Sequence, residues 1–492
     1  MMKQFAKTAA ICTAAGILAL GLALTGCSTG GTSNEVYVTS ISQTTASDGT
    51  PQYTVFYSDG TSAVLSGTSS GNSSNTVKDA YEAYLEETGE ELSFSDFLKE
   101  YLSVEDDSNA QAVAACLNST LKIYAESVET QLSLNPFWGT TEVSDVVIST
   151  GAAVIYRIDE ETDTAYLVTN YHVVYNEDAD TEKNGGTIAR AVHGYLYGSE
   201  SEPSLVDEDG DGTADTDENG YTEYDYGESA VAFEYVGGSM ENDIAVLRGS
   251  LSALRALNPD VKAVTVADGY YVGETAIAIG NPEGDGISVT QGIISTEYEE
   301  ITLEMGGKRR SYRTLRIDTP LYEGNSGGGL FNLSGELIGI TNAGSKEDQN
   351  INYAVPIDLV TGVADNIIDY SLDHDDSTNG AYRITLGVSV TAQSSRYVYD
   401  GETGYGHIEE EVTAASVTKN SIAETLGLKE GDVIDAILVN GTEHEVLRTF
   451  QIYDVLLTVR AGDSIRIRYE RDGALQVTDG YTTSSADLSP IE

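Results

Sequence analysis

The stretch Gly324-Asn325-Ser326-Gly327-Gly328 decides how the rest of this chain is interpreted. It places a serine among glycines, which adopt the backbone conformations of a tight turn without steric cost. Such a turn would expose the hydroxyl of Ser326 and point the N–H groups of Gly324 and Ser326 at one spot. We therefore take Ser326 as a candidate nucleophile and these two N–H groups as a candidate oxyanion hole.

Two motifs upstream supply the partners that such a serine needs. Val168-Thr169-Asn170-Tyr171-His172 ends an apolar run in a histidine, and Asn242-Asp243-Ile244-Ala245-Val246 begins one with an aspartate. A serine hydroxyl is a poor nucleophile until an imidazole takes its proton, and a carboxylate must fix the imidazole tautomer. Each motif alone fits a structural residue, but all three in this order predict a catalytic triad of His172, Asp243 and Ser326. The remaining histidines, 193, 374, 407 and 444, lie in polar loop sequence, and we expect their side chains to face solvent.

Most of the chain has the pattern of a β protein. From about residue 110 to 365, short apolar strands alternate with Gly and Asn turns, which is typical of a barrel or sandwich. A second β-rich unit spans roughly 383–475, with one helical segment near Ile422 to Leu426.

Several longer strings resemble the HtrA/Deg family of trypsin-like proteases with a C-terminal PDZ domain. They are Ala278-Ile279-Gly280-Asn281-Pro282-Glu283-Gly284, Val289-Thr290-Gln291-Gly292-Ile293-Ile294-Ser295, Gly335-Glu336-Leu337-Ile338-Gly339-Ile340 and Asn352-Tyr353-Ala354-Val355-Pro356-Ile357. The resemblance covers about 120–475. Two departures are Gly329, where many members have proline, and Thr150-Gly151-Ala152, which lacks a second glycine.

This resemblance implies a mainly β fold, a chymotrypsin-like double β-barrel at 110–370 followed by a PDZ domain at 380–478. It also implies an ATP-independent serine endopeptidase acting on unfolded or surface proteins, with no cofactor required for catalysis and a homotrimer as the expected assembly. A second hypothesis is a non-catalytic surface peptide-binding scaffold or chaperone on a degenerate protease fold. The intact triad motifs argue against that second hypothesis.

The resemblance also locates the pocket for the P1 side chain. Pro320 aligns with the base of the S1 pocket, and Asn342-Ala343-Gly344 aligns with its wall. With no acidic group placed to hold Lys or Arg, a small to medium apolar P1 residue is expected. Asn325 replaces the aspartate that pairs with a new N-terminus in trypsin, so we expect activation by loop ordering.

The C-terminal unit carries strings that resemble a PDZ peptide site. Ile384-Thr385-Leu386-Gly387-Val388 resembles the carboxylate-binding loop, and Leu426-Gly427-Leu428-Lys429-Glu430-Gly431-Asp432 resembles the signature that follows. The N–H groups of Leu386, Gly387 and Val388 would receive a peptide C-terminus by β-augmentation. A small β domain without a ligand is the alternative, and the insertion Arg396 to Glu410 could block the groove.

An acidic segment between His172 and Asp243 matches the spacing of a calcium loop. Its oxygen ligands would be Asp207, Asp209, Asp211, the Thr213 carbonyl, Asp215 and Glu218, with Gly212 at the turn. Flanking helices are not evident, and a solvated acidic loop is equally compatible with the composition. The sequence thus leaves a structural Ca²⁺ site and a bare loop as alternatives.

The N-terminus has the pattern of an export signal. Lys3 and Lys7 precede an apolar segment, Ala9 to Leu22, and Leu24-Thr25-Gly26-Cys27 resembles a bacterial lipoprotein cleavage box. Residues 1–27 are therefore expected to be a lipoprotein signal peptide, with Cys27 lipidated and the protein anchored to the extracytoplasmic face of the cell membrane. An ordinary signal peptide is the alternative.

Residues 28–105 are expected to form a small α+β spacer or docking module, with β-strands within 35–66 and helical periodicity over 76–102. Cys116 would be the one cysteine left after lipidation, which predicts a buried thiol and no intramolecular disulfide. The chain has 26 Lys+Arg and 79 Asp+Glu, a net charge of −53. Such a surface repels phosphate backbones, so nucleic-acid partners are excluded.

Overall fold

The computed structural model describes residues 38–45, 51–57, 62–66, 108–135, 139–344, 350–371, 381–401 and 404–491. The chain divides into two compact units, residues 1–109 and 110–492. Cys27, His374 and the predicted helix over 76–102 lie outside the described residues. No helix in the described ranges is both long enough and apolar enough to cross a bilayer.

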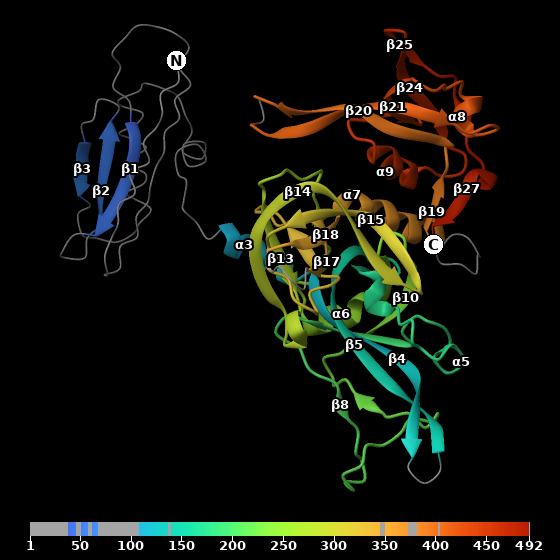
Figure 1. Cartoon of the computed structure of the whole chain (residues 1–492). Coiled ribbons are helices and arrows are strands. Elements are labelled where there is room, and N and C mark those ends of the chain that lie inside the picture. Colours follow the sequence, from blue (N-terminus) through green and yellow to red (C-terminus); the bar gives the residue numbers. More distant parts are fainter. Residues whose placement is uncertain are drawn as a thin grey trace. The chain divides into compact units, whose positions relative to one another are not determined.

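The first unit contains a three-stranded antiparallel sheet in the order β1-β2-β3 (Figure 1). The strands are Val38–Thr45, Pro51–Tyr57 and Ser62–Ser66. The β-strands predicted within 35–66 are therefore confirmed.

The second unit begins with helix α3, Ser108–Leu117, and then forms a closed barrel in the order β10-β11-β6-β5-β4-β7. The strands are β4 Thr120–Asn135, β5 Gly139–Asp159, β6 Thr164–Thr169, β7 Ala191–Leu196, β10 Val231–Ser239 and β11 Ile244–Ser250. Short connections add α4 Tyr171–Val174, α5 Thr181–Asn184, β8 Ser204–Leu205, β9 Tyr224–Asp225 and α6 Leu251–Leu257. Cys116 is buried in α3, as predicted.

The next sheet has seven strands in the order β12-β17-β16-β13-β14-β15-β18, and β17 also pairs with β18, which makes the sheet ring-like. The strands are β12 Thr265–Val266, β13 Thr275–Gly280, β14 Ser288–Met305, β15 Lys308–Ile317, β16 Gly329–Phe331, β17 Glu336–Gly344 and β18 Asn352–Pro356. The predicted mainly β fold is confirmed as one closed barrel plus this second sheet.

A C-terminal sheet follows in the order β20-β21-β22-β24-β25, so β20 lies at an edge (Figure 1). Its strands are β20 Val388–Tyr399, β21 Gly406–Val417, β22 Val433–Val439, β23 Thr442–Glu445, β24 Ser464–Arg471, β25 Ala474–Val477 and β26 Tyr481–Thr482. Helices α8, Ile422–Thr425, and α9, Gln451–Thr458, accompany it. The final strand β27, Leu488–Ile491, pairs with β19, Ala381–Ile384.

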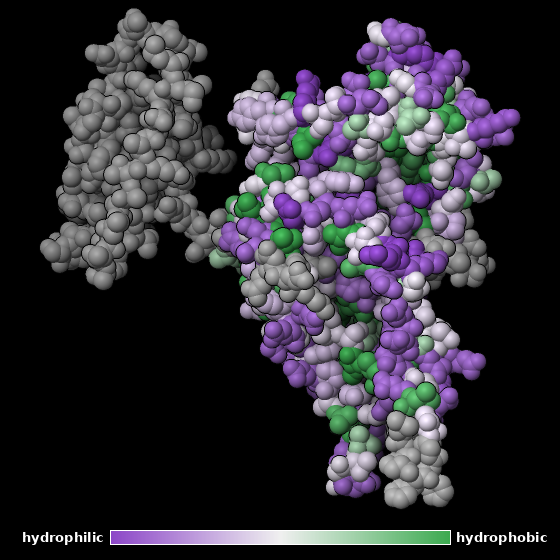
Figure 2. Space-filling model, viewed as in Figure 1, coloured by the Kyte–Doolittle hydropathy of each residue, from purple (hydrophilic) through white to green (hydrophobic). Residues whose placement is uncertain are grey.

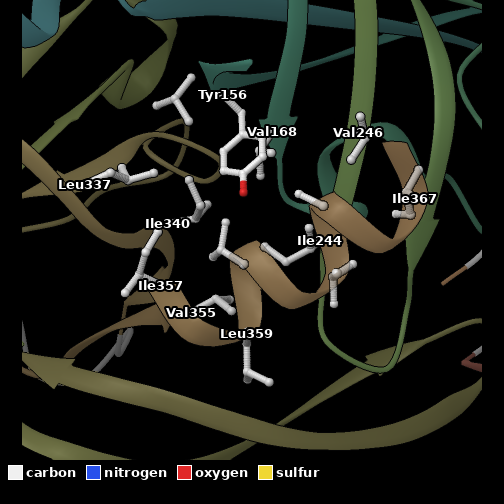
Figure 3. Packing of buried hydrophobic residues seen from close by; sticks show 14 of the residues in the cluster. Tyr156, Val168, Ile244, Val246, Leu337, Ile340, Val355, Ile357, Leu359 and Ile367 are labelled. Atoms are coloured by element: carbon white, nitrogen blue, oxygen red, sulfur yellow. The ribbon is translucent and has the colours of Figure 1, made fainter. Parts of the chain in front are cut away.

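Helix α7, Ile357–Asp365, continues into a π-helical turn, Asn366–Ser371, and forms the centre of the largest core cluster. Figure 3 shows side chains from both sheets packed around Ile357, Leu359 and Ile367 of this helical segment: Tyr156, Val168, Ile244, Val246, Leu337, Ile340 and Val355. Ala381, Leu457 and Ile491 of the C-terminal part belong to the same buried cluster. A Cβ added at Gly362 of α7 would lie 3.0 Å from Leu457 Cδ1, so the two helices approach closely. One buried cluster therefore spans the protease part and the C-terminal part, and a separate cluster fills the interior of the C-terminal sheet.

Among the described residues, hydrophilic ones prevail on the face drawn in Figure 2, with apolar ones scattered between them. The expected solvent exposure of the other histidines is wrong for His193. It lies in β7 with its ring stacked on Tyr226, 3.9 Å between centroids, and burial lowers its pKa. His407 and His444 also lie in strands, β21 and β23, and are half-buried.

Candidate active site

His172 lies in the single turn of α4, immediately after β6 brings the chain across the barrel. Its Nδ1 lies 2.7 Å from Asp243 Oδ2, and its backbone N–H donates to Asp243 Oδ1 over 2.9 Å. One carboxylate thus fixes both the ring and the main chain of the histidine. With Nδ1 donating to this carboxylate, Nε2 is left as the proton acceptor.

Asp243 precedes β11 with φ of 53°, a left-handed conformation that is uncommon outside glycine. The Asn170 side chain donates to the Asp243 carbonyl over 2.9 Å and helps to hold this turn. The carboxylate is fully buried and accepts further hydrogen bonds from Tyr312 Oη at 3.2 Å and Asn342 Nδ2 at 2.5 Å. A buried charge is costly unless it is hydrogen-bonded, and this one is surrounded by donors.

The His172 ring is partly accessible, with 31% of the side chain exposed. Burial disfavours its protonated form, but the charge and hydrogen bond of Asp243 outweigh that effect and raise the pKa of His172. The arrangement stabilises the imidazolium that forms when the ring accepts a proton.

Ser326 lies in the turn between β15 and β16, and its backbone is tied to the first barrel. The Ala152 N–H donates to the Ser326 carbonyl over 2.9 Å. Gly327, φ 87°, has no room for a side chain, since a Cβ would lie 2.1 Å from the Ala152 carbonyl. The Ser326 hydroxyl donates to the Asn342 carbonyl over 2.6 Å, and no hydrogen bond joins it to His172 among the described residues.

Gly151 separates the serine turn from the histidine helix. A Cβ at Gly151 would lie 2.6 Å from Val173 Cγ1 and 3.1 Å from the Ser326 carbonyl. Val173 follows His172 directly, so the predicted nucleophile and base are held on either side of one glycine. The structure therefore brings His172, Asp243 and Ser326 to one place.

The candidate oxyanion hole is oriented by a neighbouring loop. The Glu283 N–H donates to the Glu323 carbonyl over 2.6 Å, which fixes the peptide group between Glu323 and Gly324. Gly324 has φ of 94°, and a Cβ there would lie 2.1 Å from the Asn281 carbonyl. Within the described residues, neither Gly324 N–H nor Ser326 N–H donates to any protein group. Both predicted donors are therefore free to bind an oxyanion.

The structure contradicts the predicted S1 pocket at one of its three residues, Asn342. Pro320 is half-buried, and its carbonyl accepts a 2.8 Å hydrogen bond from Thr290 Oγ1. Asn342 was expected in the pocket wall, but its side chain is directed at Asp243 and Tyr312. Ala343 lies in β17, and its side chain is outside the described set.

Tyr312 and Asn342 form hydrogen bonds to the Asp243 carboxylate, and the sequence analysis did not predict this role for either residue. Tyr312 Oη also contacts Asn342 Oδ1 at 3.0 Å, so the three side chains form one buried network. Burial and the charge of Asp243 raise the pKa of Tyr312 well above its usual value, which keeps the phenol protonated as a donor. In the sequence, Tyr312 is indistinguishable from an ordinary strand tyrosine.

Helix α9 of the C-terminal part contacts the residues adjacent to this network. Asn242 Nδ2 donates to Tyr453 Oη over 3.0 Å, next to Asp243 in the chain. Arg313, next to Tyr312, is buried and pairs with Asp454 at 2.8 Å and with Asp358 at 2.9 Å.

The candidate peptide site of the C-terminal part lies at the start of β20. Gly387, φ 74°, has its carbonyl bound by the Thr418 N–H, and the Leu386 carbonyl is bound by the Ala423 N–H, both over 2.8 Å. In this part of the described chain, the N–H groups of Leu386 and Gly387 donate to no protein group. Val388 pairs with Val417 of β21. The loop thus offers free donors beside an edge strand.

The structure gathers three of the six predicted calcium ligands. Carboxylate oxygens of Asp207, Asp209 and Asp211 lie within 4.8 Å of one another. Asp207 also accepts hydrogen bonds from the N–H groups of Asp211 and Gly212. The carboxylates of Asp215 and Glu218, also predicted as ligands with the Thr213 carbonyl, do not join this group, and the Asp215 carboxylate accepts from the Glu208 N–H.

Known proteins are similar in sequence to the part of the chain that contains this site. Residues 151–340 match the model of the trypsin-like peptidase domain. The serine protease Do-like HtrA of Lactococcus lactis subsp. lactis is 27% identical over 69% of this chain and 72% of its own length. The protein of the same name from Bacillus subtilis is 27% identical over 67% of this chain and 62% of its own. The solved HtrA-type protease AlgW with a decapeptide aligns at 24% identity and a TM-score of 0.44, covering 77% of this chain and 98% of AlgW.

The matched domain contains the triad motifs, so the protein carries a trypsin-like serine peptidase domain. More particularly, it is an HtrA-like serine protease.

Proposed function

We propose that the protein is an endopeptidase that cleaves peptide bonds of unfolded or surface proteins through an acyl-enzyme formed on Ser326. The observation that carries this proposal is the pairing of His172 with Asp243, a fully buried carboxylate whose surrounding donors hold it in place.

In the first half of the reaction, the Ser326 Oγ proton passes to His172 Nε2 while Oγ bonds to the scissile carbonyl carbon. The carbonyl oxygen becomes an oxyanion and accepts hydrogen bonds from the N–H groups of Gly324 and Ser326. His172 then gives its proton to the leaving nitrogen, and the C–N bond breaks. Water repeats the sequence on the acyl-enzyme and releases the acid product.

The hydroxyl of Ser326 must turn before it can attack. It donates to the Asn342 carbonyl, so its proton has to leave that acceptor for His172. This is a rotation about one side-chain bond. The backbone on either side is already held by hydrogen bonds to Ala152 and Thr341.

The C-terminal part is proposed to bind peptide C-termini in the manner of a PDZ domain. Support comes from the free N–H groups of Leu386 and Gly387 and from the position of β20 at the sheet edge. A peptide strand added along β20 would extend the sheet. For the protease site we propose a small to medium apolar P1 residue, because Pro320 at the expected pocket base carries no charge.

We also propose a membrane location and a homotrimer. The location rests on the lipobox-like sequence at Cys27, since acylation there would anchor the chain outside the cytoplasm. Cell fractionation tests it: Cys27→Ala should move the protein to the soluble or secreted fraction. Mature wild-type protein without lipid by mass spectrometry would refute it.

A structural Ca²⁺ ion at 207–218 is a further proposal, supported by the close approach of Asp207, Asp209 and Asp211. These three carboxylates would hold the ion, and its role would be to neutralise their repulsion rather than to take part in catalysis.

The test of the proposed function is casein digestion by wild type and by Ser326→Ala. Hydrolysis by wild type and none by the variant is the expected result. Activity retained by Ser326→Ala would refute the role of this serine. A peptide-binding scaffold, the alternative function, would show no hydrolysis in either protein.

A further inference from the structure

Lys122 is a buried lysine of β4, with 2% of its surface exposed. Within the described part of the chain, no carboxylate forms an ion pair with it. Its ammonium donates to the Gly284 carbonyl over 2.5 Å and lies 4.9 Å from the centre of the Tyr124 ring. Burial lowers the pKa of Lys122, and only more distant carboxylates, such as Glu202, act in the opposite direction. Burying an ammonium this way is costly, so a stability role alone does not explain it.

The acceptor of this hydrogen bond belongs to the loop that orients the candidate oxyanion hole. Gly284 follows Glu283, whose N–H binds the Glu323 carbonyl over 2.6 Å. Glu283 itself has φ of 57°, which a residue with a side chain rarely adopts. Such a conformation persists only where surrounding contacts impose it. Lys122 provides one of these contacts on the carbonyl next to the strained residue.

The orientation of the Glu323–Gly324 peptide group determines whether the Gly324 N–H points into the oxyanion hole. In a trans peptide the C=O and N–H point in opposite directions. With the Glu323 carbonyl directed at the Glu283 N–H, the Gly324 N–H faces away from the loop and donates to no protein group among the described residues. Rotating this peptide group would remove the Gly324 donor from the hole.

A second brace holds the start of the same loop. Asn281 is fully buried, and its Nδ2 donates to Thr150 Oγ1 over 2.9 Å while its Oδ1 accepts from the Gly286 N–H over 2.9 Å. The Asn281 carbonyl also accepts a hydrogen bond from the Gly284 N–H over 3.2 Å. Lys122 holds the opposite side of that residue, the Gly284 carbonyl, which Asn281 does not bind.

We propose that Lys122 is a positioning residue for the oxyanion hole, acting through the Gly284 carbonyl and the Glu283 N–H on the peptide group of Gly324. This inference rests on the proposed function, because an oxyanion hole matters only if Ser326 forms an acyl-enzyme. Lys122 contacts no reacting atom.

The test compares wild type, Lys122→Met, Lys122→Gln and Lys262→Met with one peptide substrate and with a peptide boronate. The boronate forms a tetrahedral adduct on the serine and so measures the oxyanion hole directly. We expect Lys122→Met to lose ten- to a hundredfold in kcat and a similar factor in boronate affinity, with KM within twofold of wild type. Lys122→Gln keeps a donor and should recover part of both. The matched control, Lys262→Met, removes an exposed lysine and should change neither.

Thermal unfolding separates positioning from folding. Replacing a lone buried ammonium with an apolar side chain of similar length should leave the melting temperature equal or higher. If Lys122→Met lowers the melting temperature by more than a few degrees, the kcat and boronate affinity of Lys122→Gln are used to test the positioning role instead. Wild-type kcat and boronate affinity in the Lys122 variants would overturn this inference alone. Absence of Ser326-dependent hydrolysis in wild type would instead overturn the proposed function.

Discussion

Asn342 Nδ2 donates a 2.5 Å hydrogen bond to Asp243 Oδ2, while the carbonyl of the same Asn342 accepts the proton of Ser326 Oγ. One residue of β17 therefore contacts both ends of the predicted triad. Its side chain supports the carboxylate that holds His172, and its main chain holds the nucleophile in its resting rotamer.

Replacing Asn342 with leucine should lower kcat by about ten- to a hundredfold with little change in KM. A hydrogen bond to a buried charge contributes about 1.5–3 kcal/mol, and each 1.36 kcal/mol is tenfold in rate. Steady-state kinetics on a peptide substrate measure the effect. Tyr312→Phe, which removes a longer bond to the same oxygen, should cost less. Equal kcat in wild type and Asn342→Leu would contradict a supporting role.

The pH profile of kcat/KM should rise through a pKa above the ordinary histidine value of ~6.5. Asp243 raises the pKa of His172, and the ring must be neutral to accept the serine proton. The same shift makes a stability prediction in the Ser326→Ala background, which does not digest itself. A raised folded-state pKa gives stability that is fully present below ~6.5 and lost as pH rises through the folded value.

The stability advantage of Ser326→Ala over Ser326→Ala/His172→Gln should therefore be larger at pH 5.5 than at pH 9. Urea denaturation at both values measures it. An advantage that does not change with pH would show that Asp243 leaves the His172 pKa unshifted.

Asp454 should make the protein less stable as pH rises toward neutrality. Burial raises the pKa of Asp454 to about 7, with Arg313 acting in the opposite direction and Asp358 adding repulsion. Between the ordinary value of ~3.9 and about 7 the folded state binds more protons than the unfolded state, so the free energy of unfolding falls with pH.

The Asp454→Asn variant should lack this fall in the free energy of unfolding, which is at most about 1.4 kcal/mol per pH unit. Relative to wild type, the variant should gain stability between pH 4.5 and pH 8 in urea titrations. Arg313→Lys serves as the control because it keeps the charge and the titrating carboxyl. If the free energy of unfolding changes equally with pH in wild type and Asp454→Asn, Asp454 is ionised over the whole range from pH 4.5 to pH 8.

Calcium should raise the melting temperature of metal-free protein at millimolar concentrations. Three clustered carboxylates fit a weak site of about 10⁻⁴–10⁻³ M affinity, and a ligand that binds only the folded state stabilises it. Asp209→Ala with Asp211→Ala should abolish the gain, whereas Asp260→Ala, an exposed aspartate elsewhere, should not. No shift up to about ten millimolar would leave the segment a solvated acidic loop.

The sequence predicted those features that are carried by contiguous residues. The glycines around Ser326, the strand end at His172 and the turn at Asp243 each have a local signature, and the structure brings the three together. Tyr312 and Asn342 have none, because their importance comes from pairing in space with Asp243, 69 and 99 positions away in sequence.

Other errors have the same cause. His193 was expected to face solvent, because its local sequence does not reveal that Tyr226 stacks on its ring. Nothing next to Lys122 in the chain indicates that its side chain is buried. Helix α9 was missed because eight residues are too few for a periodic pattern to stand out from strands. Its place is set by packing of Leu457 on α7, which only the folded chain shows.

The buried contacts that join α7 to Leu457, Ala381 and Ile491 should couple unfolding of the protease part to unfolding of the C-terminal part. Domains connected only by a linker unfold independently, but here neither part can lose its packing without exposing apolar side chains of the other. Residues 110–491 should therefore melt in one transition, and a protease fragment ending near residue 371 would present a bare apolar face. A substitution that unfolds the C-terminal part should then also reduce the amount of folded protease.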